Sequence, residues 1–395
     1  MNPTPEDHVD IRDGDEAIVR QPGDAGTTGP ARLPSLTGIR IFAAGLVLVA
    51  HAFFLPGLYA DAAVQKGTSA LVPLATSSVT LFFVLSGLVL TWSARPADTA
   101  VRFWRRRFVR IFSNHAVAWA LGSALVIGYG IHVNLVSLGD DYSPLALLGN
   151  LFLVQNWVPS KEFLLGPNPL AWSLACEFFF YLLFPFLLPL VRRIPVHKLR
   201  FAAGVLVLVG LSVPVLALLL QGPDFLPTVP VPSDQIWLAY FLPAARLPEF
   251  VLGMVLARIL AEGLWRPLRT GVILPLPFLA IGTLAVLPPV FAFGPYFALP
   301  VALIVGEVAS RDVRGVPSFL RRPAMIYLGD RSFALYMIHY VVIMYLCRFV
   351  FTPGATFSVP VATALILLVV IPVSLGAAWL LHRSVERPAV RRLAG

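Results

Sequence analysis

The sequence predicts an all-α membrane protein, a polytopic bundle of about ten transmembrane helices with both termini in the cytoplasm. Its mean hydropathy is +0.79, and only 13% of its 395 residues are charged, against roughly a quarter in soluble domains. Apolar runs long enough to cross a bilayer recur along the chain. Basic residues follow every second run, as the positive-inside rule predicts for cytoplasmic loops.

Ten apolar segments account for the predicted spans. They lie near residues 36–56, 70–93, 112–132, 170–191, 201–220, 236–257, 271–289, 293–309, 325–349 and 359–382. The stretch 145–157 is also apolar but is shorter than a straight crossing requires, so we expect a re-entrant or interfacial piece there.

The basic residues also predict the sidedness of the loops. Clusters of arginine and lysine follow the even-numbered spans, whereas the intervening loops hold almost no cations beyond Lys66 and Lys161. We expect loops 95–111, 192–200, 258–269 and 311–322 in the cytoplasm, and loops 57–69, 133–168, 221–235 and 350–358 outside. The net charge of +9 follows from this topology. No basic run is interleaved with exposed aromatics, so the expected surroundings are membrane lipid and not nucleic acid.

One membrane domain, residues 33–390, is expected between two cytoplasmic tails. Residues 1–32 carry seven acidic and three basic residues and no signal-peptide core, which predicts a disordered acidic tail. Residues 391–395 form the second, short tail. Cys176 and Cys347 fall within predicted spans, and no Cys/His spacing indicates a metal or redox site. The excess of arginine over lysine is typical of a GC-rich bacterial genome, so the expected location is a bacterial plasma membrane.

The first predicted span, LTGIRIFAAGLVLVAHAFF, carries two ionisable residues, Arg40 and His51. Eleven helical steps return to within about 20° of the starting direction, so the two side chains share one face, roughly 16 Å apart along the axis. An ionisable residue inside a bilayer is costly and indicates a functional site. The structural alternative is an interfacial anchor at Arg40 and a hydrogen-bonded packing residue at His51.

A block of arginines opens the third predicted span. Six arginines lie within residues 95–110, among them Arg106, Arg107 and Arg110. A topological anchor needs only one or two cations, and planar guanidinium groups bind phosphates through paired donors. We therefore expect an anionic ligand at this block, with simple anchoring as the alternative.

Two further spans carry acids. Glu177 is the only acid in the fourth span and precedes Tyr181 by four residues, so the two share a helix face. A lone carboxylate in a membrane needs a partner or a proton, and a structural pair with an arginine of another span is the alternative to a functional role. In the sixth span, Arg246 and Glu249 are three residues apart and are expected to pair within the helix.

The ninth span carries a polar face of its own. Tyr336, His339 and Tyr340 fall on one side of the predicted helix. Aromatic residues near a membrane interface are common, but a histidine there is less so. The structural alternative for His339 is a hydrogen bond to a neighbour.

In order and local sequence, these motifs resemble the acyltransferase-3 family of integral-membrane acyltransferases. The resemblance covers about residues 33–390. It rests on the Arg40–His51 spacing and on FFVLSGLVL at 82–90, RFWRRRFVRIF at 102–112, WSLACEFFFYLLFP at 172–185, RLPEFVLGM at 246–254, LGDRSFALYMIHY at 328–340 and HRSVERP at 382–388. Two positions depart from the family. Thr37 stands where an acid is common, and the run Cys176-Glu177-Phe178 stands where two acids are common and keeps only one.

The resemblance implies transfer of an acyl group, often acetyl, from acyl-CoA to a hydroxyl group, without a metal. It implies two catalytic residues, His51 and Glu177. It also implies an acyl-CoA site that comprises Arg40, Arg106, Arg107, Arg110, Arg246, Tyr336 and His339. A neutral imidazole suits deprotonation of a hydroxyl, and a transient acyl-histidine is the other mechanism that remains open.

Two kinds of acceptor fit the sequence. One is a small hydrophobic natural product such as a macrolide antibiotic. We favour this acceptor because the sequence is typical of a stand-alone enzyme from a GC-rich genome. The other is a sugar of a cell-envelope polysaccharide. A multi-span transporter is the alternative from another class, because buried ionisable residues are common there too. We see no inverted repeat, and a receptor or assembly scaffold does not explain the shared face of Arg40 and His51.

Overall fold

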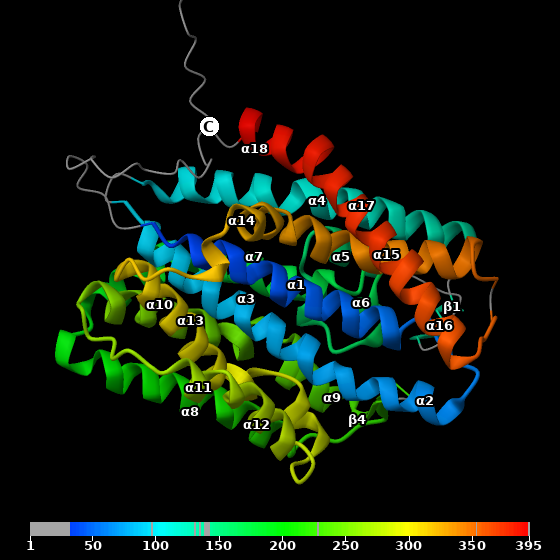
Figure 1. The fold of residues 1–395 in the computed structure, drawn as a ribbon, viewed down its shortest axis with the longest axis horizontal. Coiled ribbons are helices and arrows are strands. Elements are labelled where there is room, and N and C mark those ends of the chain that lie inside the picture. Colours follow the sequence, from blue (N-terminus) through cyan, green and yellow to red (C-terminus); the bar gives the residue numbers. More distant parts are fainter. Residues whose placement is uncertain are drawn as a thin grey trace, which may run out of the picture.

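The computed structural model describes residues 32–95, 98–129, 132–133, 136–137, 143–226, 229–352 and 354–393. Over these residues the chain is predominantly helical, with two short antiparallel strand pairs. The long helices lie side by side along the longest axis of the molecule (Figure 1). The predicted tail 1–32 falls outside the described residues except for Arg32, and the predicted tail 391–395 begins inside the last helix.

The helices are α1 (Pro34–Phe54), α2 (Ala62–Gly67), α3 (Val72–Ser93), α4 (Ala100–Tyr129), α5 (Pro144–Leu151), α6 (Lys161–Leu165), α7 (Ala171–Arg193), α8 (Leu199–Ala217), α9 (Ser233–Ile236), α10 (Pro243–Ala261), α11 (Thr270–Ile273), α12 (Pro275–Thr283), α13 (Ala298–Val313), α14 (Pro323–Asp330), α15 (Ser332–Phe349), α16 (Val359–Leu365), α17 (Ile371–Leu381) and α18 (Arg387–Leu393). The strands are β1 (His132–Val133), β2 (Val136–Ser137), β3 (Asp224–Leu226) and β4 (Val229–Pro232). The predicted re-entrant stretch 145–157 contains α5 and a short 3₁₀ turn.

Seven helical segments of the described chain are long and apolar enough to cross a membrane. They are Pro34–Phe54, Ala62–Ser93, Ala100–Tyr129, Ala171–Arg193, Val196–Ala217, Ser332–Phe349 and Val359–Leu393. These segments correspond to the first five and the last two predicted spans. The all-α, polytopic class is therefore confirmed, while the count of ten and the side of each terminus stay predictions.

Three of the predicted spans are interrupted or short. Segment 236–257 divides at Leu242 between the π-helical turn η4 (Trp237–Phe241) and α10, because Pro243 lacks the N–H that would continue the helix. Segment 271–289 forms two short helices, α11 and α12, that end at Thr283. Segment 293–309 begins as a 3₁₀ turn and becomes α13.

The arginine block lies within a helix and not in a loop. Helix α4 begins at Ala100, so Arg107 and Arg110 stand on its first turns and have fixed directions. Arginine has a high helix propensity, and the apolar criterion for the span missed this basic beginning. Residues of one helix can therefore point both to the surface and toward the interior of the bundle.

Two glycines allow α3 and α10 to approach closely. A Cβ atom at Gly87 would collide with the backbone carbonyl of Phe250, and one at Gly253 with that of Val84. Small residues at helix crossings permit such backbone contact in membranes. Helix α1 packs against α3, α14 and α15, so one side of it faces the interior of the bundle while Phe42 and Leu46 are exposed.

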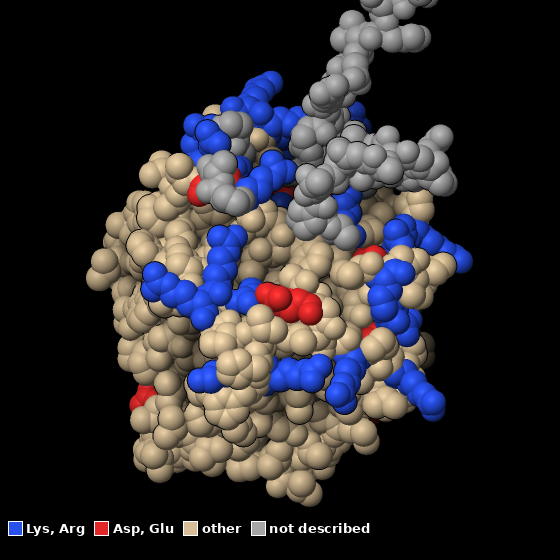
Figure 2. Space-filling view, turned by 90° about the vertical axis from the view of Figure 1, so that its left-hand side faces the viewer, with Lys and Arg blue, Asp and Glu red and all other residues tan. Residues whose placement is uncertain are grey.

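The surface of the molecule divides by composition. Large apolar side chains such as Phe201, Leu219 and Val286 are exposed on the bundle, as contact with lipid tails requires. Lys and Arg gather on the end of the bundle where α1 begins, the left-hand end in Figure 1 and the face shown in Figure 2. Helix α1 thus runs from the basic end toward the opposite end, with Arg40 before His51.

Candidate functional site

Two histidines that are far apart in the sequence meet inside the bundle. His51 lies near the end of α1, and His339 lies in α15. Their rings are nearly parallel, with an interplanar angle of 16° and centroids 5.3 Å apart. The Nδ1 atom of His51 is 3.0 Å from the Nε2 atom of His339. Both histidines were predicted as site residues, and the structure brings them into direct contact.

The partners of His339 determine which nitrogen atoms carry hydrogen. The Nδ1 atom of His339 is 2.9 Å from the backbone oxygen of Leu335, and a carbonyl oxygen only accepts, so this nitrogen is the donor. In a neutral ring, the Nε2 atom of His339 is then an acceptor, and it binds the Nδ1–H of His51. For two neutral rings, these hydrogen bonds leave the Nε2 atom of His51 with a free lone pair.

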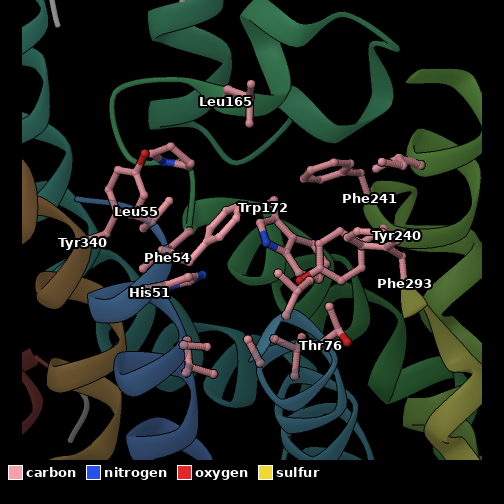
Figure 3. A pocket seen from close by; sticks show the side chains of 18 of the residues that line it. His51, Phe54, Leu55, Thr76, Leu165, Trp172, Tyr240, Phe241, Phe293 and Tyr340 are labelled. Atoms are coloured by element: carbon pink, nitrogen blue, oxygen red, sulfur yellow. The ribbon is translucent and has the colours of Figure 1, made fainter. Parts of the chain in front are cut away.

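His51 borders a cavity of about 140 Å³. Aromatic side chains form much of its wall, among them Phe54, Trp172, Tyr240 and Phe293. Figure 3 shows the His51 ring and the Trp172 indole reaching the same space from different helices. His51 is only partly buried, because its ring meets this space. The imidazole is therefore accessible to a bound molecule.

A second group of polar side chains lies along α1, α4 and α7. Arg40 is within electrostatic range of Arg110 and Glu177. Arg107 lies 5.9 Å from the ring centre of Tyr181, whose hydroxyl donates to Glu177 over 2.6 Å. The predicted residues Arg40, Arg107, Arg110 and Glu177 are thus neighbours.

Arg40, Arg107 and Arg110 form what we call the arginine group. Two of these side chains have a nitrogen atom without a hydrogen-bond partner. The Nε atoms of Arg40 and Arg107 are buried without a hydrogen-bond partner. A buried polar atom without a partner is rare in native structures and needs an explanation. An anionic ligand with several oxygen atoms supplies acceptors of the required kind.

The remaining predicted residues have other direct partners. Arg106 forms a partly exposed ion pair with Asp98, at 3.0 Å. Tyr336 shares a hydrogen bond of 2.6 Å with Ser173 and lines the cavity beside His51. Arg246 is fully buried against Glu249, as its spacing predicted, and its place in an acyl-CoA site is not supported by this geometry.

Sequence reasoning missed most of the cavity wall. Trp172, Tyr240, Phe241 and Phe293 come from α7, η4 and the loop before α13. Aromatic residues are so common in membrane helices that none of them stood out. Among the described residues, no cluster of three or more His, Cys, Asp or Glu side chains has the arrangement of a metal site.

Comparison with known proteins gives a consistent result. A family model described as an acyltransferase domain matches residues 33–383. Acyltransferase MdmB of Streptomyces mycarofaciens is 37% identical over 368 residues, which cover 92% of each chain. O-acetyltransferase OatA of Staphylococcus aureus is 24% identical over 80% of this chain, and the match spans 51% of OatA. No solved structure matches the chain. The chain belongs to the acyltransferase-3 family of membrane acyltransferases.

Proposed function

We propose that the protein is an acyl-CoA-dependent O-acyltransferase. It transfers an acyl group, in the first instance acetyl, to a hydroxyl of a natural product such as a macrolide antibiotic, or of a sugar. The observation that carries the proposal is the His51–His339 hydrogen bond, because it leaves one imidazole nitrogen as a base beside an accessible cavity. Membership of an acyltransferase family supports the reaction type.

The arginine group is the proposed site for the phosphates of acyl-CoA. Arg40, Arg107 and Arg110 supply several guanidinium donors, and two of their Nε atoms lack a partner within the protein. Paired guanidinium donors match phosphate oxygens. Arg40 and His51 lie on one face of α1, roughly 16 Å apart along its axis, and the pantetheine arm has a comparable reach. The thioester then lies near His51 while the phosphates stay at the basic end.

The reaction requires one proton to move twice. The Nε2 atom of His51 accepts the proton of the acceptor hydroxyl as that oxygen attacks the thioester carbonyl carbon. A carbon–oxygen bond forms, the carbon–sulfur bond breaks, and the imidazolium returns the proton to the departing thiolate. The Nε2 atom of His339 accepts the Nδ1–H of His51 throughout, and so stabilises the charged ring. Glu177 accepts a hydrogen bond from Tyr181 and lies within electrostatic range of Arg40, and these contacts support a role for it in orienting the donor.

A second candidate is O-acetylation of a cell-envelope polysaccharide. The match to OatA, an O-acetyltransferase, favours this candidate. The match to MdmB covers more of this chain at higher identity, and it comes from a Streptomyces species. We therefore place the small natural product first and the polysaccharide second.

The test of this function is release of the CoA thiol from acetyl-CoA by the purified protein in lipid nanodiscs, with an alcohol such as cyclohexanol present as the acyl acceptor. We expect His51→Ala to reduce the rate about 10²- to 10⁴-fold, the usual contribution of a general base. His197 is exposed on another part of the chain, so His197→Ala is a matched control that retains the wild-type rate. Equal rates for the two variants, with both proteins folded, would contradict the role of His51. Absence of acetyl-CoA binding would contradict the function.

A further inference from the structure

The polar groups on the wall of the cavity beside His51 are few, and two of them are already used. The hydroxyl of Thr76 donates to the backbone oxygen of Ala292 at 2.7 Å. The hydroxyl of Tyr336 is 2.6 Å from that of Ser173. Among the described residues that line the cavity, none is an Asp, Glu, Lys or Arg. The wall is therefore uncharged and mainly apolar, and its other polar groups besides the His51 ring include the Trp172 indole and the Tyr240 hydroxyl.

Aromatic packing gives this cavity a fixed shape. The ring centres of Trp172 and Tyr240 are 4.0 Å apart, and those of Tyr240 and Phe293 are 5.5 Å apart. Behind this wall, the guanidinium of Arg246 lies 5.7 Å from the ring centre of Trp172 and 5.5 Å from that of Tyr240. The buried Arg246–Glu249 pair thus supports the rings without reaching the cavity.

The mainly apolar wall makes binding of a sugar ring in this cavity unfavourable. A sugar ring presents several hydroxyl groups, and each one buried without a partner loses the hydrogen bonds that it makes in water. An apolar ring or branch loses nothing comparable and gains contact with the aromatic wall. A volume of about 140 Å³ is close to the roughly 150 Å³ of an apolar protein cavity that holds a benzene ring.

We propose that this cavity binds one uncharged apolar ring or branch of the acyl acceptor, next to the hydroxyl that is acylated. The assignment rests on the proposed function. The acceptor hydroxyl must reach the Nε2 atom of His51, and His51 borders the cavity. In the proposed function the donor lies along α1 between Arg40 and His51. The cavity on the wall beside His51 is then left for the acceptor. The acceptor class is therefore a hydroxylated hydrophobic compound.

Two matched variants of α3 test this assignment. Ala75 lines the cavity and is 7% exposed, whereas Val89 is exposed on the same helix. Ala75→Phe fills the cavity, and Val89→Phe adds the same ring elsewhere. Acetyl transfer from acetyl-CoA is measured with two probes, cyclohexanol and methyl glucoside. We expect wild type and Val89→Phe to prefer cyclohexanol, and Ala75→Phe to lose about tenfold or more of that transfer, the effect of a poor fit in an apolar pocket.

A third variant keeps the test decisive if Ala75→Phe does not fold. Phe293 is partly buried in a loop on the cavity wall. Phe293→Ala enlarges the cavity, so we expect it to acetylate the bulkier decahydronaphthol faster than wild type does. Preference of wild type for methyl glucoside, or equal behaviour of Ala75→Phe and Val89→Phe, would overturn the assignment. Loss of butyryl transfer with normal acetyl transfer in Ala75→Phe would also overturn it, because the cavity would then hold the acyl chain.

Thermal unfolding separates this assignment from the proposed function. Cyclohexanol without acetyl-CoA is expected to raise the unfolding temperature of wild type and of Val89→Phe relative to that of Ala75→Phe. This difference supports the cavity assignment even if acetyl-CoA does not bind, a result that contradicts the proposed function alone. Equal shifts for all three proteins would overturn the cavity assignment, whatever the donor.

Discussion

The bundle contains two groups in which arginine and glutamate lie close together, and the groups differ in how fully they are satisfied. In α10, Arg246 binds both carboxylate oxygens of Glu249 and also contacts Thr80 and the backbone of Tyr240. Its Nε atom has a partner, and both side chains are fully buried. Near α1, Arg40 and Arg107 lie close to Glu177, yet their Nε atoms have none.

This difference indicates which charges serve the fold and which serve a ligand. A buried ion pair in which every guanidinium nitrogen has a partner has little capacity left for a substrate, and removal of one member leaves the other as an uncompensated charge. A group with unpaired donors is suited to an anion that supplies the missing acceptors. This difference supports a structural role for the Arg246–Glu249 pair and agrees with the proposed role of the arginine group in binding the donor.

The largest expected effect concerns the side of the membrane on which each loop lies. Labelling of a loop from outside the cell is expected to be all-or-none. The proposed acyl-CoA site requires the arginine group to face the cytoplasm, where acyl-CoA is found, and the cation alternation predicts this. In a background without Cys176 and Cys347, an impermeant thiol reagent should label Asp224→Cys in intact cells and not Asp98→Cys. The reverse pattern would place the arginine group on the outer side and remove it as an acyl-CoA site.

Breaking the buried Arg246–Glu249 ion pair should have the largest effect on the stability of the protein. Arg246→Met leaves Glu249 as a buried unpaired charge, which typically costs about 3–5 kcal/mol. Thermal unfolding in detergent should show this loss, and the double variant with Glu249→Met should recover much of it. The matched single variant Arg107→Gln should unfold near the wild-type temperature. A double variant as unstable as Arg246→Met would contradict the assignment of the pair.

Removal of the partner of His51 should reduce turnover without weakening the donor site. His339→Leu leaves the Nδ1–H of His51 without an acceptor, and we expect a loss of about 10- to 100-fold, the range known for partners that orient metal-binding histidines. The amide oxygen of His339→Gln can accept this hydrogen, so we expect partial rescue of kcat. The KM for acetyl-CoA should remain that of wild type. Equal losses in the two variants would mean that His339 acts by packing alone.

The sequence predicted features that depend on local periodicity. The helix at α1, and the common face of Arg40 and His51, follow from eleven steps along one helix. The contact of His51 with His339 joins positions 288 residues apart, and no periodicity encodes it. The proximity of Arg40, Arg107 and Glu177 also depends on how three helices pack.

The breaks within the predicted spans were not predicted, because an apolar run does not show where a helix ends. The predicted ninth span contains a break at Arg331, between α14 and α15, where the polar run Asp330-Arg331-Ser332 interrupts the apolar sequence. The predicted sixth span breaks at Leu242, directly before Pro243. The residue before a proline disfavours helical geometry, so this second break had a signal in the sequence. The cavity wall forms partly at these irregular places, where η4 carries Tyr240 and Phe241.

The central claim, that the unsatisfied arginines bind the phosphates of the donor, is tested most directly by comparing two ligands. Acetyl-CoA carries the nucleotide and phosphates, and acetyl-pantetheine lacks them. We predict that wild type binds acetyl-CoA more tightly, and that Arg107→Gln loses about tenfold of this affinity, the effect of one charge-assisted hydrogen bond. Its affinity for acetyl-pantetheine should not change. Equal affinity of Arg107→Gln and wild type for acetyl-CoA, with both proteins folded, would contradict the claim.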